Sequence, residues 1–255
     1  MLAWVVRFSF VTVGALALRW QVSEQQMRAR VRRLEREGFL RRDRRAANAP
    51  AVVVPTNRAL VRLGLSVRRP AHFDGRFGHE VAIIKRVTAA EAYFRAHKQP
   101  GAVVLTEREL LRAEADGQRY SVDVLEPHGE RRRRWPDYVV ETDGGRTAAE
   151  LEFSAKTTRR LESIVRGYLR ASQYNFVDFI VLPGPAHQAL RDRLSAIIET
   201  AARAGGAYEL LGLATPSHVR VVTWRDPYPA LHAGIAPFPA TTRENGLLDV
   251  GESAL

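Results

Sequence analysis

The stretch from Pro136 to Lys156 constrains the fold of this chain more than any other segment. It consists of two β-prone runs that flank the turn residues 143–145, Asp-Gly-Gly. A turn of this composition between two such runs predicts a β-hairpin. The chain around it must therefore supply the rest of a sheet.

Three acids of this hairpin form the first candidate site. Side chains alternate between the two faces of a strand, so Glu150 and Glu152 are expected on one face, with their apolar neighbours in the core. Asp137 on the opposite strand is expected beside them at a sheet edge, and Lys156 follows the second strand. Such a group could bind Mg²⁺ and a phosphodiester.

The distribution of charge indicates a second candidate site. Residues 1–70 hold 15 Arg and no Lys against four acids, which accounts for the entire net charge of +11. This is typical of a nucleic-acid-binding module joined to a neutral domain, and the alternative is a solvated basic face. Cysteine is absent, which excludes disulfides and thiolate metal sites and favours a reducing, cytoplasmic setting.

Helix signals dominate the basic N-terminal segment. Apolar residues from Leu2 predict a first helix, and Thr12 is a candidate N-cap of a second. Ser23 and Gln26 form a capping-box pattern that opens a third helix, which ends at Gly38. Its expected buried stripe consists of Met27, Val31 and Leu34. A hairpin over residues 39–54 and a helix over 56–65 follow.

This order, with the segment VRRLEREGFLRR, resembles the winged helix-turn-helix superfamily. The resemblance implies that the third helix enters the major groove of double-stranded DNA and that the wing follows phosphates. The candidate base-contacting residues are Gln25, Gln26, Arg28, Arg30 and Arg33. The candidate phosphate-contacting residues are Arg32, Arg36, Arg41, Arg42, Arg44 and Arg45. A protein–protein module is the alternative.

Breaker-rich residues after this segment predict a domain boundary, with a first domain over 1–70, a second over 76–225 and an irregular tail over 226–255. The elements expected in the second domain are helices at 78–97, 106–115, 156–171 and 185–205, and strands at 120–125, 176–182 and 218–224 beside the central hairpin.

Helix, three strands, helix, strand resembles the PD-(D/E)xK nuclease-like fold, so the expected class is α/β (α+β) with a restriction-endonuclease-like αβββαβ domain. The resemblance implies that Asp137 and a second acid hold Mg²⁺ and that Lys156 assists water attack. An upstream helix acid, Glu107 or Glu109, would complete the site. Lys156 lies further from the acids than the pattern places it.

The segments TEREL, PD, ELEFSAK and RRLESIVRGYL, after a winged helix, resemble the replication-relaxation family. That resemblance implies a role in plasmid or mobile-element replication or mobilisation. It also places Tyr168 toward the site, as a nucleophile or as a buried hydrogen-bonding residue. Arg131–Arg134 is either a solvated loop or a contact for a DNA backbone.

Two functions follow from these patterns. One is a double-stranded DNA-binding protein whose nuclease-like domain nicks or cleaves DNA with Mg²⁺. The other is a non-catalytic regulator whose nuclease-like domain serves dimerisation. A winged helix joined to a ligand sensor is a third. Carboxylates of Asp137 and Glu150 or Glu152 within about 4–5 Å would favour the nuclease, whereas an acid buried against an Arg would favour the regulator. A homodimer is an expected partner and a membrane is not, since the apolar run at 8–18 is shorter than a span.

Overall fold

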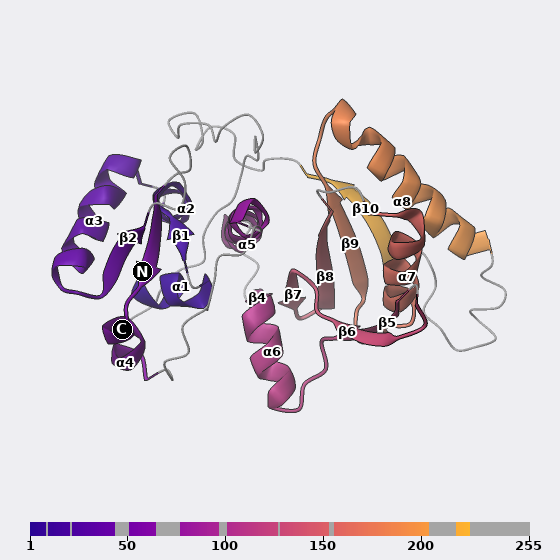
Figure 1. Cartoon of the computed structure of the whole chain (residues 1–255), viewed down its shortest axis with the longest axis horizontal. Coiled ribbons are helices and arrows are strands. Elements are labelled where there is room, and N and C mark those ends of the chain that lie inside the picture. Colours follow the sequence, from indigo (N-terminus) through magenta and orange to yellow (C-terminus); the bar gives the residue numbers. More distant parts are fainter. Residues whose placement is uncertain are drawn as a thin grey trace. The chain divides into compact units, whose positions relative to one another are not determined.

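The computed structural model describes residues 1–8, 10–20, 22–43, 51–64, 77–96, 101–126, 128–152, 156–203 and 218–224 (Figure 1). The chain divides into two compact units, one N-terminal and one comprising Gly101–Arg225. The expected tail at 226–255 lies outside the described residues. Mixed helices and sheets make this an α+β protein.

Five helices and a small antiparallel sheet, in the order β1-β3-β2, form the described part of the N-terminal unit. The elements are α1 (Leu2–Phe8), β1 (Val11–Thr12), α2 (Val13–Arg19), α3 (Glu24–Arg36), β2 (Leu40–Asp43), β3 (Val52–Pro55), α4 (Asn57–Arg62) and α5 (Phe77–Ala96). Every helix expected in this segment is present. The short β1 was not predicted.

Side-chain caps fix the starts of these helices. Thr12 accepts a hydrogen bond from the backbone N–H of Ala15 at 3.1 Å, which confirms it as the N-cap of α2. Ser23 and Gln26 form the expected capping box of α3. The helix ends before Gly38, whose φ of +77° lies in the left-handed region that glycine adopts without strain.

The core of the N-terminal unit includes a face of α5. Met27 and Val31 of α3 are buried with residues of β3 and of the first two helices, and Val81 and Ile84 of α5 join the same cluster. The sequence had assigned this helix to the second domain. An apolar helix face shows that a helix packs against a core but not which core it covers, so its partner could not be read from the pattern.

A five-stranded sheet in the order β10-β9-β8-β7-β4 forms the centre of the second unit, beside a separate two-stranded ribbon of β5 and β6. The elements are β4 (Val103–Thr106), α6 (Glu107–Ala115), β5 (Val122–Leu125), β6 (Arg131–Arg134), β7 (Tyr138–Thr142), β8 (Gly145–Glu152), α7 (Thr158–Leu169), β9 (Phe176–Val181), α8 (Pro185–Arg203) and β10 (Val219–Thr223). The sequence did not predict β4 or β6.

The predicted hairpin is the centre of this sheet. Antiparallel β7 and β8 pair Tyr138 with Ala149 and Thr142 with Gly145 across the expected turn. β4 continues the antiparallel part, whereas β9 and β10 are parallel to β8 and are reached through the crossover helices α7 and α8. β8 is thus the middle strand, and the expectation that its acids lie at a sheet edge is wrong.

Helices α7 and α8 cover the same face of this sheet (Figure 1). Leu161, Ile164 and Tyr168 of α7 are fully buried in one cluster with Phe179 of β9 and Leu194 of α8. The hydrophobic effect of this burial holds the sheet and helices together. Across the described residues, no helix is both long and apolar enough to cross a membrane.

Candidate nucleic-acid interface and the buried carboxylates of β8

The exposed face of α3 carries the predicted DNA-binding side chains. At about 100° per residue, Arg32 and Arg36 lie opposite the buried stripe that contains Met27 and Val31. The members of the set on this helix are all exposed: Gln25, Gln26, Arg28, Arg30, Arg32, Arg33 and Arg36. Arg30 lies nearest the margin of the buried stripe, whereas Arg32, Arg33 and Arg36 lie on the side away from it.

Several of these arginines form exposed ion pairs within the unit. The pairs are Arg28 with Glu24, Arg33 with Glu37 at 2.8 Å, Arg42 with Glu35 at 2.8 Å and Arg41 with Asp43 at 3.1 Å. Exposed pairs of this kind contribute about 0–1 kcal/mol, so a phosphate could replace the carboxylate at little cost. Among the described residues, Arg30, Arg32 and Arg36 make no ion pair.

Gln26 is less available than its sequence position suggested. Its Oε1 accepts the backbone N–H of Ser23 at 3.0 Å as part of the capping box. A bidentate contact with adenine needs both ends of the amide, so it would break this cap. Gln25, one residue earlier, is exposed and has no such role.

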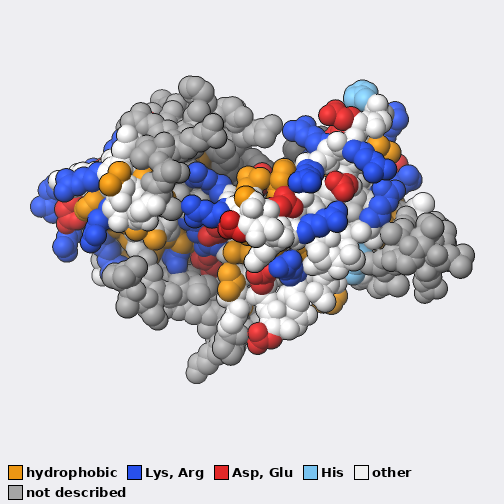
Figure 2. All heavy atoms as spheres, turned by 90° about the horizontal axis from the view of Figure 1, so that it is seen from below, with side chains coloured by type: hydrophobic (Ala, Val, Ile, Leu, Met, Phe, Trp, Pro, Cys, Tyr) orange, Lys and Arg blue, Asp and Glu red, His pale blue; other side chains and the backbone are white. Residues whose placement is uncertain are grey.

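β2 extends the basic surface beyond α3. Arg41 and Arg42 are exposed on this strand, whereas Arg44 and Arg45 of the predicted wing lie outside the described residues. Figure 2 shows Lys and Arg side chains crowded at the end of the N-terminal unit where α3 lies.

The predicted catalytic acids lie in a different environment. The carboxylate of Glu150 has no exposed surface and receives both prongs of the Arg134 guanidinium, with Nε 3.0 Å from Oε1 and Nη2 bound to Oε2. The charge of Glu150 raises the pKa of Arg134 against the opposing effect of burial. Arg134 therefore keeps its charge, and both oxygens of Glu150 accept hydrogen bonds.

Tyr168 completes this group. Its hydroxyl donates to Oε1 of Glu150 inside the core, and both side chains are fully buried. Burial first, and then the charge of Glu150, raise the pKa of Tyr168 well above its usual value. The hydroxyl thus keeps its proton, as the buried hydrogen-bonding reading of this tyrosine requires.

Glu152 has only one of its oxygens bonded. Oε2 accepts from the ammonium of Lys156, whereas Oε1 has no hydrogen-bond partner among the described residues. Burial raises the pKa of Glu152, and the charge of Lys156 opposes that shift. This carboxylate is the least satisfied charged group of the cluster.

Asp137 extends the hairpin. Its backbone N–H donates to the carbonyl of Ala149 at 3.0 Å, and its Oδ2 accepts the backbone N–H of Leu151 at 2.6 Å. The paired register of β7 and β8 ends at Tyr138 and Ala149, so Asp137 lies just before β7 and is bonded to the residues on either side of Glu150. The contact of Oδ2 is structural, because it satisfies a backbone donor at the end of the ladder.

The expected alternation of the acids and Leu151 is present, but the face of β8 that carries the acids is buried as well. Glu150 and Glu152 lie on the same face of β8 as Ala148, which belongs to the core under α7. Leu151 is also buried, on the other face, so β8 is covered on both sides. An alternating pattern distinguishes the two faces of a strand but does not show which face is exposed to solvent. Phe153, which was expected in the core with Leu151, lies outside the described residues.

The upstream acids have structural roles as well. Glu109 accepts from the backbone N–H of Thr106 at 2.7 Å in the capping box of α6, and Glu107 is exposed in the first turn of that helix. Sequence reasoning missed Glu114 near the helix end. Burial acts to raise the pKa of Glu114, but hydrogen bonds from Ser121, Tyr120 and Trp135 outweigh it and lower that pKa.

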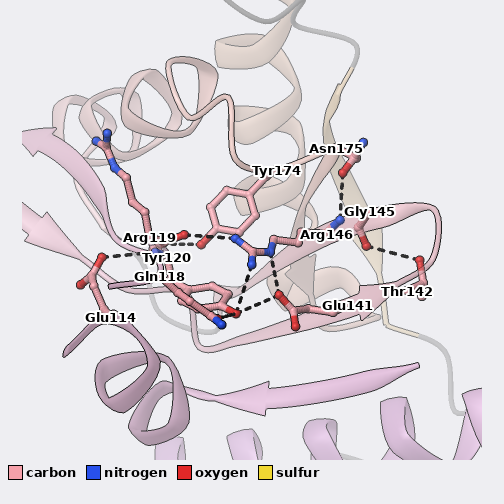
Figure 3. A network of polar contacts seen from close by, with 10 residues as sticks. All are labelled: Glu114, Gln118, Arg119, Tyr120, Glu141, Thr142, Gly145, Arg146, Tyr174 and Asn175. Atoms are coloured by element: carbon pink, nitrogen blue, oxygen red, sulfur yellow. Dashed lines mark hydrogen bonds and ion pairs between the residues drawn. The ribbon is translucent and has the colours of Figure 1, made fainter. Parts of the chain in front are cut away.

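A second polar network, around Arg146, was also missed (Figure 3). Arg146 pairs with Glu141 at 2.6 Å and stacks on the ring of Tyr120 at 4.5 Å, while its backbone N–H donates to Asn175. Burial and then the bond to Glu141 raise the pKa of Tyr120 to about 12. Glu141 faces Arg146 across the hairpin turn, but Tyr120 and Asn175 are 26 and 29 residues away from Arg146, so no local pattern reports those contacts.

The carboxylates of β8, as they lie here, do not fit Mg²⁺. Both oxygens of Glu150 accept hydrogen bonds from Arg134, and the positive charge of this arginine would repel a Mg²⁺ ion at the same carboxylate. The described residues hold no group of three or more His, Asp or Glu that could bind a metal ion. Two buried acids, Glu150 and Glu152, are instead each paired with one cation, Arg134 and Lys156 respectively.

Comparisons with family models, with curated proteins and with solved structures found no match for this chain.

Proposed function

We propose that this protein binds double-stranded DNA through α3 and β2 of its N-terminal unit and that its second unit is not catalytic. The observation that carries the first part is the exposed face of α3, where Arg32 and Arg36 lie opposite the buried stripe without a described ion pair. Such a face on a capped helix suits a DNA groove.

The order of elements supports this proposal. A helix, a short strand, two more helices and two strands, with the sheet order β1-β3-β2, agree with the resemblance to the winged helix-turn-helix. In that arrangement α3 enters the major groove, and β2 with the segment after it contacts phosphates. Gln25 and Arg33 would contact bases, while Arg32, Arg36, Arg41 and Arg42 would neutralise phosphates.

The second part of the proposal rests on Glu150. The carboxylate of Glu150 accepts two bonds from Arg134 and one from Tyr168, which occupy three of its roughly four lone-pair sites. The second unit then serves association or scaffolding, and a homodimer of the regulator kind is part of this proposal. Sedimentation equilibrium of the full chain would test the dimer.

Fluorescence anisotropy of a labelled duplex tests the DNA-binding claim. We expect Arg32→Ala/Arg36→Ala to weaken affinity about tenfold or more and to reduce its salt dependence, because two phosphate contacts are lost. The control is Arg112→Ala, which removes an exposed arginine from α6 in the second unit. Equal affinities of the α3 variant and the wild type would contradict the proposal.

One observation favours Mg²⁺-dependent nicking as a second candidate. Oε1 of Glu152 is buried without a described partner, and Lys156 lies beside it. A rearrangement that freed Glu150 from Arg134 would give this group a ligand set. Nicking of supercoiled plasmid that requires Mg²⁺ and is lost in Asp137→Ala would support this second function. The same result would support a role in plasmid replication or mobilisation.

A further inference from the structure

The four consecutive arginines of β6 have two different roles. Arg134 turns inward and binds the buried carboxylate of Glu150, with a quarter of its side chain exposed. Arg131, Arg132 and Arg133 are exposed. The sequence alone did not decide whether this run is a solvated loop or a contact for a DNA backbone. In the structure it is a strand in which Arg134 is bound to Glu150 and the other three arginines are exposed.

The ribbon of β5 and β6 is held firmly on α7. The hydroxyl of Ser163 donates to the carbonyl of Leu125, and Arg160 pairs with Glu126 at the end of β5. At Gly167 a Cβ would meet Val124 Cγ2 at 3.0 Å and Asp123 O at 3.1 Å, so the missing side chain allows α7 to pack closely on this strand. The arginines of β6 therefore project from a ribbon that is anchored on α7.

The acids near this surface are already engaged or exposed. Asp123, which lies opposite Arg133 across the ribbon, pairs with Arg119 at 3.4 Å. Glu130 immediately precedes the strand and is exposed. In the described part of the chain, no ion pair involves Arg131, Arg132 or Arg133, and these three cations outnumber the exposed acids beside them, Asp123 and Glu130.

We propose that Arg131, Arg132 and Arg133 form a second, sequence-independent contact surface for nucleic-acid phosphates, an inference that rests on the proposed DNA binding. Arginine suits this role because its planar fork binds phosphate with two hydrogen bonds. Alternate residues of a strand are roughly 6.7 Å apart, so Arg131 and Arg133 can engage different phosphates of one backbone. The surface offers no aromatic ring or amide for reading bases, which makes the contact electrostatic.

Salt titration of duplex binding by the full chain tests this surface. Each lost phosphate contact lowers the slope of log affinity against log salt by about 0.9, so Arg131→Ala/Arg132→Ala/Arg133→Ala is expected to lower it by about two to three. Arg131→Lys/Arg132→Lys/Arg133→Lys keeps the charges and should keep most of the slope. Arg112→Ala, also in the second unit, should leave the slope unchanged.

The outcomes separate this inference from the proposed function. A wild-type slope in the triple alanine variant, together with a reduced slope in Arg32→Ala/Arg36→Ala, would overturn the β6 surface alone. Absence of salt-dependent duplex binding by the wild type would overturn both. Polyglutamate and unlabelled duplex DNA are also compared as competitors at equal charge concentration. If polyglutamate competes better than the duplex, the surface binds an acidic protein and the inference is overturned. Urea unfolding of each variant verifies that it is folded.

Discussion

Arg134 and Glu150, sixteen residues apart in the sequence, form a two-pronged ion pair whose carboxylate is completely buried. The pair joins the ribbon of β5 and β6 to the middle strand of the sheet. It also occupies both oxygens of Glu150, one of the three acids expected to bind Mg²⁺. The stability of the second unit should therefore depend on the pair of Arg134 and Glu150.

Removing one partner of this pair should be costly. Arg134→Met leaves the charge of Glu150 buried and uncompensated, so the free energy of unfolding is expected to fall by about 3–5 kcal/mol. Arg134→Met/Glu150→Leu removes both charges and should recover most of that loss. Urea unfolding of the two variants checks this, and a double variant as unstable as the single one would refute it.

Tyr168→Phe should destabilise the second unit by about 1.5–3 kcal/mol, because its hydroxyl donates to a charged acceptor in the core. The matched control is Tyr174→Phe, whose hydroxyl donates to the neutral carbonyl of Tyr120. That loss is expected to be smaller, about 0.5–1.5 kcal/mol. The ranking is measured by unfolding in urea, and the reverse order would argue against the role given to Glu150.

Glu152 should make stability depend on pH in a defined direction. Its pKa in the folded state is raised by burial, so the folded state binds more protons than the unfolded chain above the ordinary carboxyl pKa of about 4.3. The stabilising contribution of Glu152 to the free energy of unfolding is fully present below the ordinary carboxyl pKa and is lost as pH rises through the raised pKa of the folded state. The difference in unfolding free energy between wild type and Glu152→Gln should grow in favour of wild type as pH falls from about 7 toward 5. A difference that stays constant would contradict the raised pKa.

Gly145 should not tolerate a side chain. Its φ is +117°, and a Cβ there would lie 1.8 Å from Oδ1 of Asn175, which accepts the backbone N–H of Arg146 (Figure 3). Gly145→Ala is expected to cost about 1–3 kcal/mol from backbone strain, with further loss from the displaced amide. At Gly144 a Cβ would meet only Thr142 Oγ1 at 3.6 Å, so Gly144→Ala is the control. Equal thermal stabilities would be inconsistent with this geometry.

Local signals in the sequence were sufficient for most of the elements. The caps at Thr12 and Ser23 and the turn before Gly145 depend on neighbours within a few residues, and the structure confirms them. β1 and β4 have two and four residues, and their existence depends on pairing with Val52–Val53 and with β7. No short window contains that information.

The candidate site was harder to predict for a physical reason. Alternating acids on β8 look like a solvated face, yet Tyr168 from α7 and Arg134 from β6 cover that face and neutralise it. A charged side chain on a strand is either exposed to solvent or paired with an opposite charge in the core, and only long-range contacts distinguish the two. On α3 the same reasoning succeeded in locating the exposed set, because helix period alone determines which side chains oppose Met27 and Val31.

One assay tests the central claim, that this protein binds duplex DNA without cutting it. Supercoiled plasmid is incubated with the full chain and Mg²⁺, and retardation and topology are scored on parallel gels, before and after removal of the protein. We predict retardation that Arg32→Ala/Arg36→Ala diminishes and plasmid that stays supercoiled. Nicking that requires Mg²⁺ and is absent in Asp137→Ala, or no retardation at low salt, would contradict the account.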